Sequence, residues 1–321
     1  MPFEGAEKKL ALMIHPAVSG TPLRQLDTSF WKTVVAAAGA RILSDIRSES
    51  STAYLLSESS LFVWDHRLVL ITCGLTRPLQ ALEALGRAVP LDCLVKVLYQ
   101  RRPEVFSEAQ PTRFSDDRRQ LLRRFPGRDL AVGNDPRRQV QLFVYDRDAG
   151  TGAAPDTLEI LMTAIHADVC GEIQAGVPAH ENTSGKLGHH LRRWFPGFDW
   201  DEHWFRPPGY SANGLQGADY ATIHITPQAK GSYASLETSA TGPVSPSTFI
   251  EEVLAYFRPR EALVLGYGRR AISLQTAGAT LYAYSSQLLS RQELASCGEW
   301  PVTGLACQRH RERSPVSDLT P

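Results

Sequence analysis

The sequence predicts an α+β protein whose two halves each contain strands and helices. Apolar runs of strand length recur along the chain, and several alternate with polar residues as a strand with one buried face does. Between them lie segments with apolar residues three and four positions apart, the spacing of an amphipathic helix. The chain carries neither the G-x-G-x-x-G nor the P-loop glycine motif, so these patterns give no support for a parallel nucleotide-binding sheet.

The first half opens with a strand over 10–14 and a helix that begins near Asp27. Asp27 or either of the next two residues can cap this helix, residues 30–38 carry its apolar stripe, and Gly39 ends it. The further elements expected here are a strand over 41–46, a helix over 78–88, a strand over 92–99, a surface loop over 102–115, a basic helix over 116–125 and a strand over 140–145.

Residues 147–155, rich in Gly and Ala, are the expected linker to the second half. The elements expected after it are a strand with one polar face over 156–162, a helix over 182–194, a turn over 209–214, strands over 221–226 and 233–238, an amphipathic helix over 247–257, and strands over 262–267 and 280–284. The tail from His310 is charged, contains Pro and Ser, and is expected to be disordered.

The composition excludes several classes of function. The formal net charge is zero, and no apolar run is long enough to span a bilayer or to act as a signal peptide. The five cysteines are widely spaced and form no C-x-x-C pair, which argues against a disulfide framework and a zinc site. We therefore expect a cytoplasmic protein with no metal, no nucleic-acid partner and no membrane partner.

The central stretch of the chain is 53–74. Two apolar runs, Leu55 to Val63 and Leu68 to Thr72, flank a polar tetrad, which predicts a buried β-hairpin. The first run contains four polar residues in a row, 57–60. Polar groups inside an apolar strand need partners, so this cluster indicates a polar strand edge, a satisfied polar network or a site of chemistry.

This cluster also resembles a known processing site. Leu56-Ser57-Glu58-Ser59-Ser60, followed by Thr72-Cys73-Gly74, is similar to the self-cleavage segment of eukaryotic-type S-adenosylmethionine decarboxylase proenzymes. In that family a Glu-Ser bond is cut and the serine becomes a pyruvoyl group. The resemblance implies cleavage between Glu58 and Ser59, giving a β chain of 1–58 and an α chain of 59–321. It also implies that Cys73 is the proton donor in turnover and that Leu56 binds substrate.

Three further motifs stand in the same order as in this family. On the residues alone, Glu4 and Glu7 would be a solvated turn, and a lone histidine on a strand, His224, would be a satisfied core residue. The resemblance implies otherwise, because Phe-Glu-Gly-x-Glu-Lys opens the family and F-x-P-x-G-Y-S-x-N-G then T-I-H-I-T-P recur later. The roles implied are adenine stacking for Phe3 and Phe205, active-site carboxylates for Glu4 and Glu7, and processing for Ser211 and His224.

The resemblance further implies a buried acidic network at Asp156, Glu159 and Glu237, which binds putrescine in some family members. Buried carboxylates without partners would take up protons, so such a network needs cations. The chain departs from the family at Gln228, where a glutamate usually contacts the substrate ribose, and at Ile71, where some members have lysine.

The resemblance spans Phe3 to about Pro259 and implies a four-layer αββα sandwich of two antiparallel sheets, forming one domain over 1–309 with a tail over 310–321. The implied function is pyruvoyl-dependent decarboxylation of S-adenosylmethionine for spermidine and spermine synthesis, without pyridoxal phosphate or metal. A carbonyl joined to the substrate amine as a Schiff base supplies the electron sink that decarboxylation needs. Two alternatives stay open: a decarboxylase retuned to another amino acid, and a regulatory paralog that binds an active homologue. The choice between monomer and homodimer and the response to putrescine also stay open.

Overall fold

The computed structural model describes residues 7–16, 20–102, 104, 107–133, 139–147, 156–176, 185–229, 231–240, 244–268, 284–289 and 302–309, the backbone alone for 284–289. Phe3, Glu4, residues 148–155 of the expected linker and the tail from His310 lie outside these ranges.

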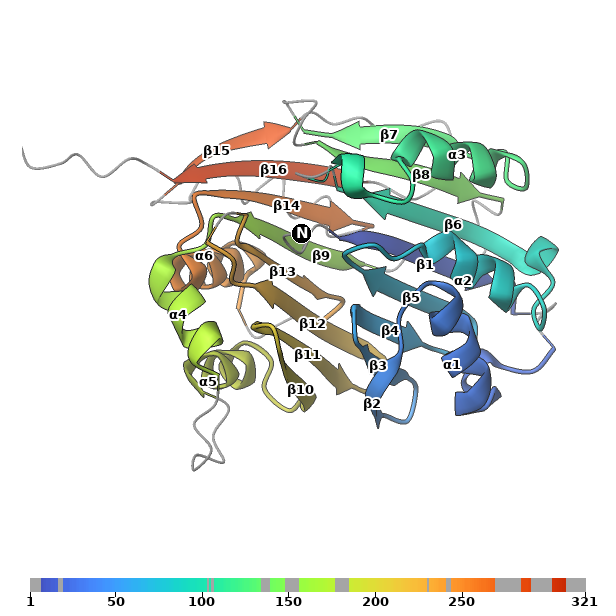
Figure 1. Ribbon diagram of the computed structural model, residues 1–321, viewed down its shortest axis with the longest axis horizontal. Helices are drawn as coiled ribbons and strands as arrows, with labels where there is room; N and C mark the ends of the chain where they lie inside the picture. The colour runs from blue at the N-terminus through green and yellow to red at the C-terminus, as the bar shows by residue number, and fades with distance from the viewer. Residues whose placement is uncertain are drawn as a thin grey trace, which may run out of the picture.

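The described strands form two eight-stranded sheets in which every pairing is antiparallel (Figure 1). The first sheet has the order β2-β3-β4-β5-β1-β6-β8-β7, and the second has the order β10-β11-β12-β13-β9-β14-β16-β15. Adding eight to each strand number of the first sheet gives the second. The two halves of the chain therefore repeat one topology, as the family resemblance implies.

The strands of the first sheet are β1 (Lys8–Ile14), β2 (Ile42–Arg47), β3 (Thr52–Leu56), β4 (Ser59–Val63), β5 (Arg67–Thr72), β6 (Leu94–Arg101), β7 (Arg128–Val132) and β8 (Val140–Asp146). Those of the second are β9 (Thr157–Thr163), β10 (Asp199–Phe205), β11 (Gly209–Gln216), β12 (Asp219–Thr226), β13 (Tyr233–Thr238), β14 (Glu261–Tyr267), β15 (Tyr284–Leu289) and β16 (Val302–Arg309). The helices are α1 (Thr28–Ala37), α2 (Pro78–Leu85), α3 (Phe114–Leu122), α4 (Ala167–Ala175), α5 (Gly185–Trp194) and α6 (Pro246–Phe257), with single 3-10 turns at Leu23–Gln25, Leu91–Cys93 and Ser107–Ala109.

Three apolar cores define four layers. Helices α1, α2 and α3 cover the outer face of the first sheet, where Trp31 shares a core with Leu10 (Figure 1). Helices α4, α5 and α6 cover the outer face of the second sheet, where Phe249 shares a core with Ile223. The third core lies between the sheets and includes Phe62, Leu161, Tyr220 and Leu265. The predicted αββα sandwich is confirmed.

Local sequence explains the helix ends. The Asp27 carboxylate accepts a 2.9 Å hydrogen bond from the Phe30 N–H, which caps α1 as predicted. Gly39 follows with a φ of 89°, a conformation that glycine adopts without a Cβ clash. At α6, Ser245 caps the helix and Pro246 occupies its first turn.

The hairpin predicted over 55–72 is in fact two hairpins. β3 ends at Leu56 and β4 begins at Ser59, so Ser57 and Glu58 form a turn instead of lying inside a strand. Both strands are buried along their whole length and the apolar run resumes at Leu61, so hydrophobic periodicity alone does not mark where the chain reverses. The polar cluster therefore lies at a chain reversal.

The turn predicted over 209–214 is wrong, because these residues form most of β11. This strand pairs along its length with β10 on one side and β12 on the other. Gly and Asn have low strand propensity, but a central strand with two partners overrides it. A Cβ at Gly214 would lie 3.0 Å from the Trp200 ring, so glycine also allows close packing there.

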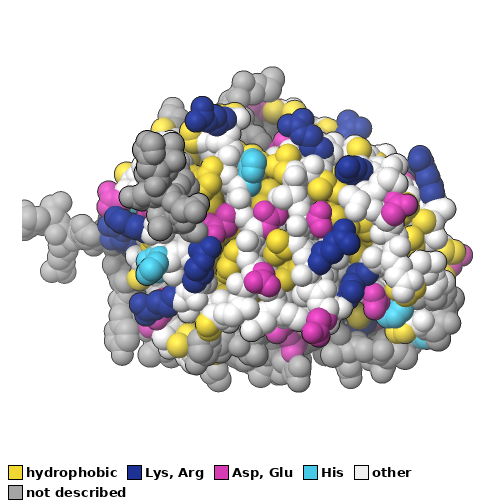
Figure 2. Space-filling view, turned by 90° about the horizontal axis from the view of Figure 1, so that it is seen from below, with side chains coloured by type: hydrophobic (Ala, Val, Ile, Leu, Met, Phe, Trp, Pro, Cys, Tyr) yellow, Lys and Arg dark blue, Asp and Glu magenta, His cyan; other side chains and the backbone are white. Residues whose placement is uncertain are grey.

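The remaining differences concern short or polar elements. Helix α2 ends at Leu85 instead of 88, and the strand expected over 280–284 overlaps the described strand β15 only at Tyr284. The sequence patterns do not predict β7, α4, β10 or β16. None of the helices in the described ranges is both long and apolar enough to span a bilayer. Figure 2 shows acidic and basic side chains interspersed over the face of the molecule that looks downward in Figure 1.

Candidate active site

A cleft of about 490 Å³ lies at the turn between β3 and β4, bordered by β10, β11 and β12 of the second sheet. It brings together residues that are far apart in the sequence. The predicted site residues that line it are Glu58, Ser59, Cys73, Phe205, Ser211, His224 and Gln228.

The Glu58-Ser59 turn has an unusual backbone. Ser59 has a φ of 125°, which side-chain-bearing residues rarely adopt and which costs about 1–3 kcal/mol. Its hydroxyl is buried and has no hydrogen-bond partner among the described residues. The turn is held in place by the residue before β2, because the Ser57 N–H donates to the Arg41 carbonyl at 2.9 Å. The backbone at the expected cleavage point is therefore strained and held in place, and the Ser59 hydroxyl makes no hydrogen bond to the described residues.

The carbonyl oxygen of Glu58 is bound by Cys73. The Cys73 backbone N–H donates to this oxygen at 3.1 Å, and the Cys73 thiol lies 3.6 Å from it. These contacts come from the turn after β5, so a backbone donor points to the place where negative charge would develop.

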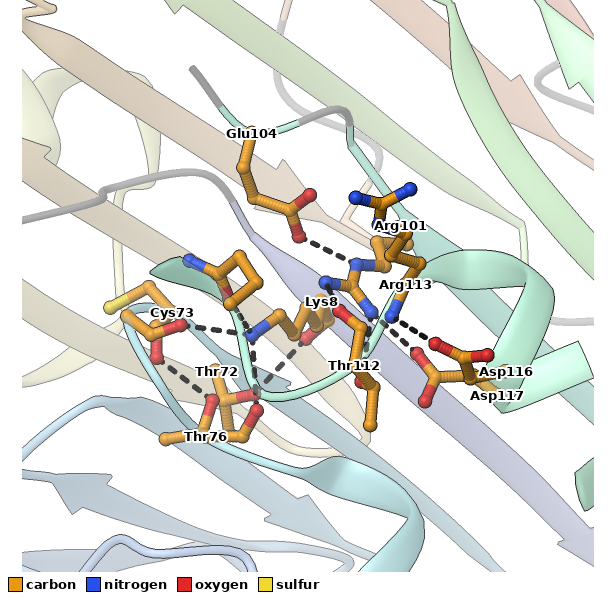
Figure 3. A network of polar contacts seen from close by, with 12 residues as sticks. Lys8, Thr72, Cys73, Thr76, Arg101, Glu104, Thr112, Arg113, Asp116 and Asp117 are labelled. Carbon is orange, nitrogen blue, oxygen red and sulfur yellow. Dashed lines mark hydrogen bonds and ion pairs between the residues drawn. The ribbon is translucent and has the colours of Figure 1, made fainter. Parts of the chain in front are cut away.

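The buried Lys8 side chain stabilises the turn that contains Cys73, on the helix-covered side of the first sheet (Figure 3). The Lys8 ammonium donates to the carbonyls of Gly74 and Thr76 at 2.9 and 3.0 Å and to the Gln110 side chain at 2.8 Å. The Thr76 hydroxyl donates back to the Cys73 carbonyl at 2.8 Å. Burial, together with the charge of the nearby Arg101 guanidinium, lowers the pKa of Lys8 to about 8. These hydrogen bonds satisfy backbone carbonyl groups of the turn that have no partner on a neighbouring strand.

His224 is paired with Ser211. Its Nδ1 lies 2.8 Å from the Ser211 hydroxyl, across the register in which the two residues face each other on β12 and β11. Burial lowers the pKa of His224 to about 3. The imidazole is therefore neutral near pH 7 and can accept a proton.

Three polar residues complete this site, and the sequence motifs did not single them out for it. Ser60, Asn213 and Thr222 lie behind His224, and Thr222 contacts the His224 Nε2 at 2.9 Å. His224 and Thr222 lie on the same side of β12, as the two-residue period of a strand requires. Ser60 comes from the first sheet and the others from the second, so only the packing of the two sheets joins them.

Glu7 belongs to a buried network between the sheets and does not line the cleft. The Lys9 ammonium bonds Glu159 at 2.8 Å and Glu237 at 2.7 Å, and the Ser235 hydroxyl donates to Glu7. Burial, together with the charge of Glu159, raises the pKa of Glu7 to about 8. Ser235 pairs with His224 across β12 and β13, so the network reaches the site through this residue.

Lys9 supplies the cation that the acidic network needs. Burial alone would lower its pKa, but the two carboxylates raise it well above the ordinary value. Asp156 precedes β9 and is half-buried, three positions before Glu159. Lys8 and Lys9 thus point to opposite faces of the first sheet. Lys8 binds the turn that contains Cys73, and Lys9 binds the acidic network.

Some of the residues predicted to contact the substrate lie on the cleft and others do not. Phe205 and Gln228 are half-buried on the cleft, and the Phe205 ring meets the His203 ring edge-on at 4.6 Å. Leu56 does not line the cleft, because its side chain is completely buried in the core beneath α1 and α2. Among the described residues, no cluster of three His, Cys, Asp or Glu side chains could hold a metal ion.

Comparison with known proteins agrees with this geometry. The family model for adenosylmethionine decarboxylase matches residues 1–290, well past Pro259, where the motifs led us to expect the likeness to fade. The chain is 32% identical over 282 residues to the S-adenosylmethionine decarboxylase proenzyme of Solanum chilense, covering 81% of this chain and 77% of that protein. It is 34% identical over 251 residues to the proenzyme of Onchocerca volvulus, covering 74% of this chain and 68% of that protein.

A solved structure shares the fold. The crystal structure of the Trypanosoma brucei AdoMetDC-delta26 monomer superposes with a TM-score of 0.60 at 21% identity, covering 78% of this chain and 99% of that one. The repeated sheet order, the Glu58-Ser59 turn and the family match agree, and this chain belongs to the adenosylmethionine decarboxylase family.

Proposed function

We propose that this chain is a proenzyme that cuts itself between Glu58 and Ser59 and then decarboxylates S-adenosylmethionine. The product is decarboxylated S-adenosylmethionine, the aminopropyl donor for spermidine and spermine synthesis. The observation that carries the proposal is the turn itself, where a buried serine hydroxyl without a partner among the described residues adjoins a carbonyl bonded by Cys73.

The first step is an acyl shift. Ser59 Oγ attacks the carbonyl carbon of Glu58, the hydroxyl proton passes to the departing Ser59 nitrogen, and the C–N bond breaks to leave an ester. Negative charge develops on the Glu58 oxygen, where the Cys73 N–H already donates. Relief of the positive φ at Ser59 favours opening of this peptide bond.

The second step is elimination. Neutral His224 removes the α-proton of residue 59, the electron pair forms a Cα=Cβ bond, and the ester C–O bond breaks to free the Glu58 carboxylate. Hydrolysis of the resulting dehydroalanine releases ammonia and leaves a pyruvoyl group at the new terminus. Ser59 lines the cleft, so a group made from it would face the substrate.

In turnover the chain's own residues bind the substrate and return a proton. The pyruvoyl carbonyl supplies the electron sink for the loss of CO2. Cys73, half-buried at the cleft, donates a proton to the substrate α-carbon. Phe205 offers a ring face for the adenine, and Gln228 offers hydrogen bonds for the ribose.

Lys9 bears on the putrescine response. Its ammonium occupies the position between Glu159 and Glu237 at hydrogen-bond distance from both, which is the charge that a diamine would supply. A second ammonium there would meet like charge in a low-dielectric interior. We therefore propose that Lys9 replaces putrescine and that the native chain does not respond to it.

Two measurements test the proposal. The intact mass of the purified protein should show two chains, 1–58 and 59–321, whereas Ser59→Ala should remain one chain. A single chain after prolonged incubation of the native protein would overturn self-cleavage. The processed protein should release CO2 from S-adenosylmethionine but not from ornithine or arginine. Release only from the latter pair would favour a retuned decarboxylase, and release from none would favour a regulatory paralog.

A further inference from the structure

Four buried polar side chains from both sheets meet behind the cleft. Ser60 belongs to β4, Asn213 to β11, and Thr222 and His224 to β12, and each is no more than 8% exposed. The Asn213 Oδ1 lies 2.6 Å from the Ser60 hydroxyl and 3.0 Å from the Thr222 hydroxyl. The His224 Nε2 lies 2.9 Å from the Thr222 hydroxyl and 3.3 Å from the Ser60 hydroxyl.

The number of hydroxyl hydrogens in this group of side chains determines which atom donates in each hydrogen bond. A carbonyl oxygen only accepts, so the single hydroxyl hydrogens of Ser60 and Thr222 both point to Asn213. Neither hydroxyl then has a hydrogen left for His224. The contact between Thr222 and Nε2 therefore requires a proton on Nε2. Since the buried imidazole is neutral, Nδ1 carries the lone pair and accepts from the Ser211 hydroxyl at 2.8 Å.

We propose that Asn213 is a positioning residue that holds His224 in the Nε2–H tautomer and so makes Nδ1 the base of the elimination step. This inference rests on the proposed self-cleavage. Asn213 acts through the two hydroxyls and through His224, and does not line the cleft.

The tautomer decides which nitrogen can react. Ser211 and His224 both line the cleft with the Glu58-Ser59 turn, and Nδ1 is the nitrogen directed to Ser211. In the elimination, Nδ1 takes the α-proton of residue 59, the Cα–H pair becomes the Cα=Cβ bond, and the ester oxygen leaves on Glu58. The opposite tautomer would present an N–H toward Ser211 and would direct its lone pair toward the buried Ser60 and Thr222 hydroxyls, which do not line the cleft.

Nitrogen-15 NMR of the histidine rings tests the tautomer without relying on activity. The sample is full-length Ser59→Ala protein, which keeps the chain uncleaved, with His224→Gln in the same background to assign the signal. The expected spectrum shows a neutral ring with the proton on Nε2. A proton on Nδ1 would mean that the Asn213 amide donates to both hydroxyls, and this result would overturn the proposal.

Matched variants test the role in processing. Asn213→Leu removes the acceptor, and Asn213→Asp keeps an oxygen in its place. In the Leu variant elimination should slow by about 10²-fold or more, since a correctly protonated base contributes roughly 10²–10⁴-fold. The ester should therefore accumulate and release two chains with hydroxylamine, while the Asp variant should keep the native tautomer and process faster than the Leu variant.

A second position protects the test against a folding defect. Thr222→Val removes the acceptor of the Nε2–H with little change of shape, and Thr222→Ser retains it. Ester accumulation in the Val variant only is the expected result. Native-like elimination in both Asn213→Leu and Thr222→Val would overturn the positioning role. If the native chain never cleaves, the proposed function fails, but the ring spectrum of the uncleaved protein still decides the tautomer.

Discussion

The Cys73 backbone N–H donates to the carbonyl oxygen of Glu58 at 3.1 Å, while the Cys73 thiol lies 3.6 Å from the same oxygen. One residue thus contacts the bond to be cut through two different groups. The backbone donor survives any substitution of the side chain, but the thiol does not. This separation leads to different expectations for self-cleavage and for turnover.

Cys73→Ala should therefore still cleave, although more slowly, and should decarboxylate poorly. The loss of one weak thiol contact leaves the N–H at the Glu58 carbonyl, whereas the proposed proton donor for the substrate α-carbon is removed. Gel electrophoresis gives the cleavage rate, and CO2 release gives the turnover. Full turnover in the Ala variant would remove Cys73 from the role of acid.

Lys8→Met should slow self-cleavage, because the carbonyls of Gly74 and Thr76 lose their donor and the Cys73 turn loosens. The native protein should also cleave more slowly above about pH 8. The pKa of Lys8 is lowered to about 8, so the ammonium loses a proton there and keeps two hydrogens for three acceptors. Cleavage rates measured from pH 6 to 10 test this, and the Met variant should lack the decline. An identical decline in both proteins would assign it to another group.

The two sheets show which parts of the fold can be predicted from the sequence. The apolar face of α6 follows from periodicity because it packs on a core, and the strand over 233–238 follows from the alternation of Ala234 and Leu236 with Ser235 and Glu237. The split between β3 and β4 does not, since every residue of both strands is buried and the apolar run resumes at Leu61. Burial on both faces hides a chain reversal from any pattern of hydrophobicity.

The site residues also fall into those that the sequence reveals and those that it does not. Glu58, Ser59, Cys73, Ser211 and His224 were found by resemblance, and they meet on one cleft. The hydrogen-bonded group behind His224 was not found as a group, because it forms only when β4 of one sheet packs against β11 and β12 of the other. Nothing in the sequence indicates that this serine, asparagine and threonine form hydrogen bonds with one another.

Lys9→Met should destabilise the protein by about 3–5 kcal/mol, because removal of one partner leaves buried carboxylates without a cation. If Lys9 replaces a diamine, putrescine should restore part of the activity and raise the melting temperature of this variant, and should do neither in the native protein. Thermal unfolding and CO2 release with and without putrescine measure both effects. Activation of the native protein by putrescine would contradict the assigned role of Lys9.

Gln228 bears on the affinity for substrate. A glutamate would accept from both ribose hydroxyls as a charged acceptor, and charge-assisted bonds contribute about 1.5–3 kcal/mol against roughly 1 kcal/mol for neutral ones. Gln228 retains one acceptor and adds a donor, so we expect nucleoside binding weaker by about one order of magnitude. Gln228→Glu should therefore lower the Michaelis constant for S-adenosylmethionine.

Self-cleavage supplies the internal control for this variant. Gln228 lies on the cleft two residues after the end of β12, and the hydrogen bonds described for the Glu58-Ser59 turn come from Arg41 and Cys73, so Gln228→Glu should cleave at the native rate. A lower Michaelis constant with unchanged cleavage assigns residue 228 to the ribose. An unchanged Michaelis constant would mean that the cleft holds its substrate without a ribose contact at this position, as a pocket retuned to another amino acid would.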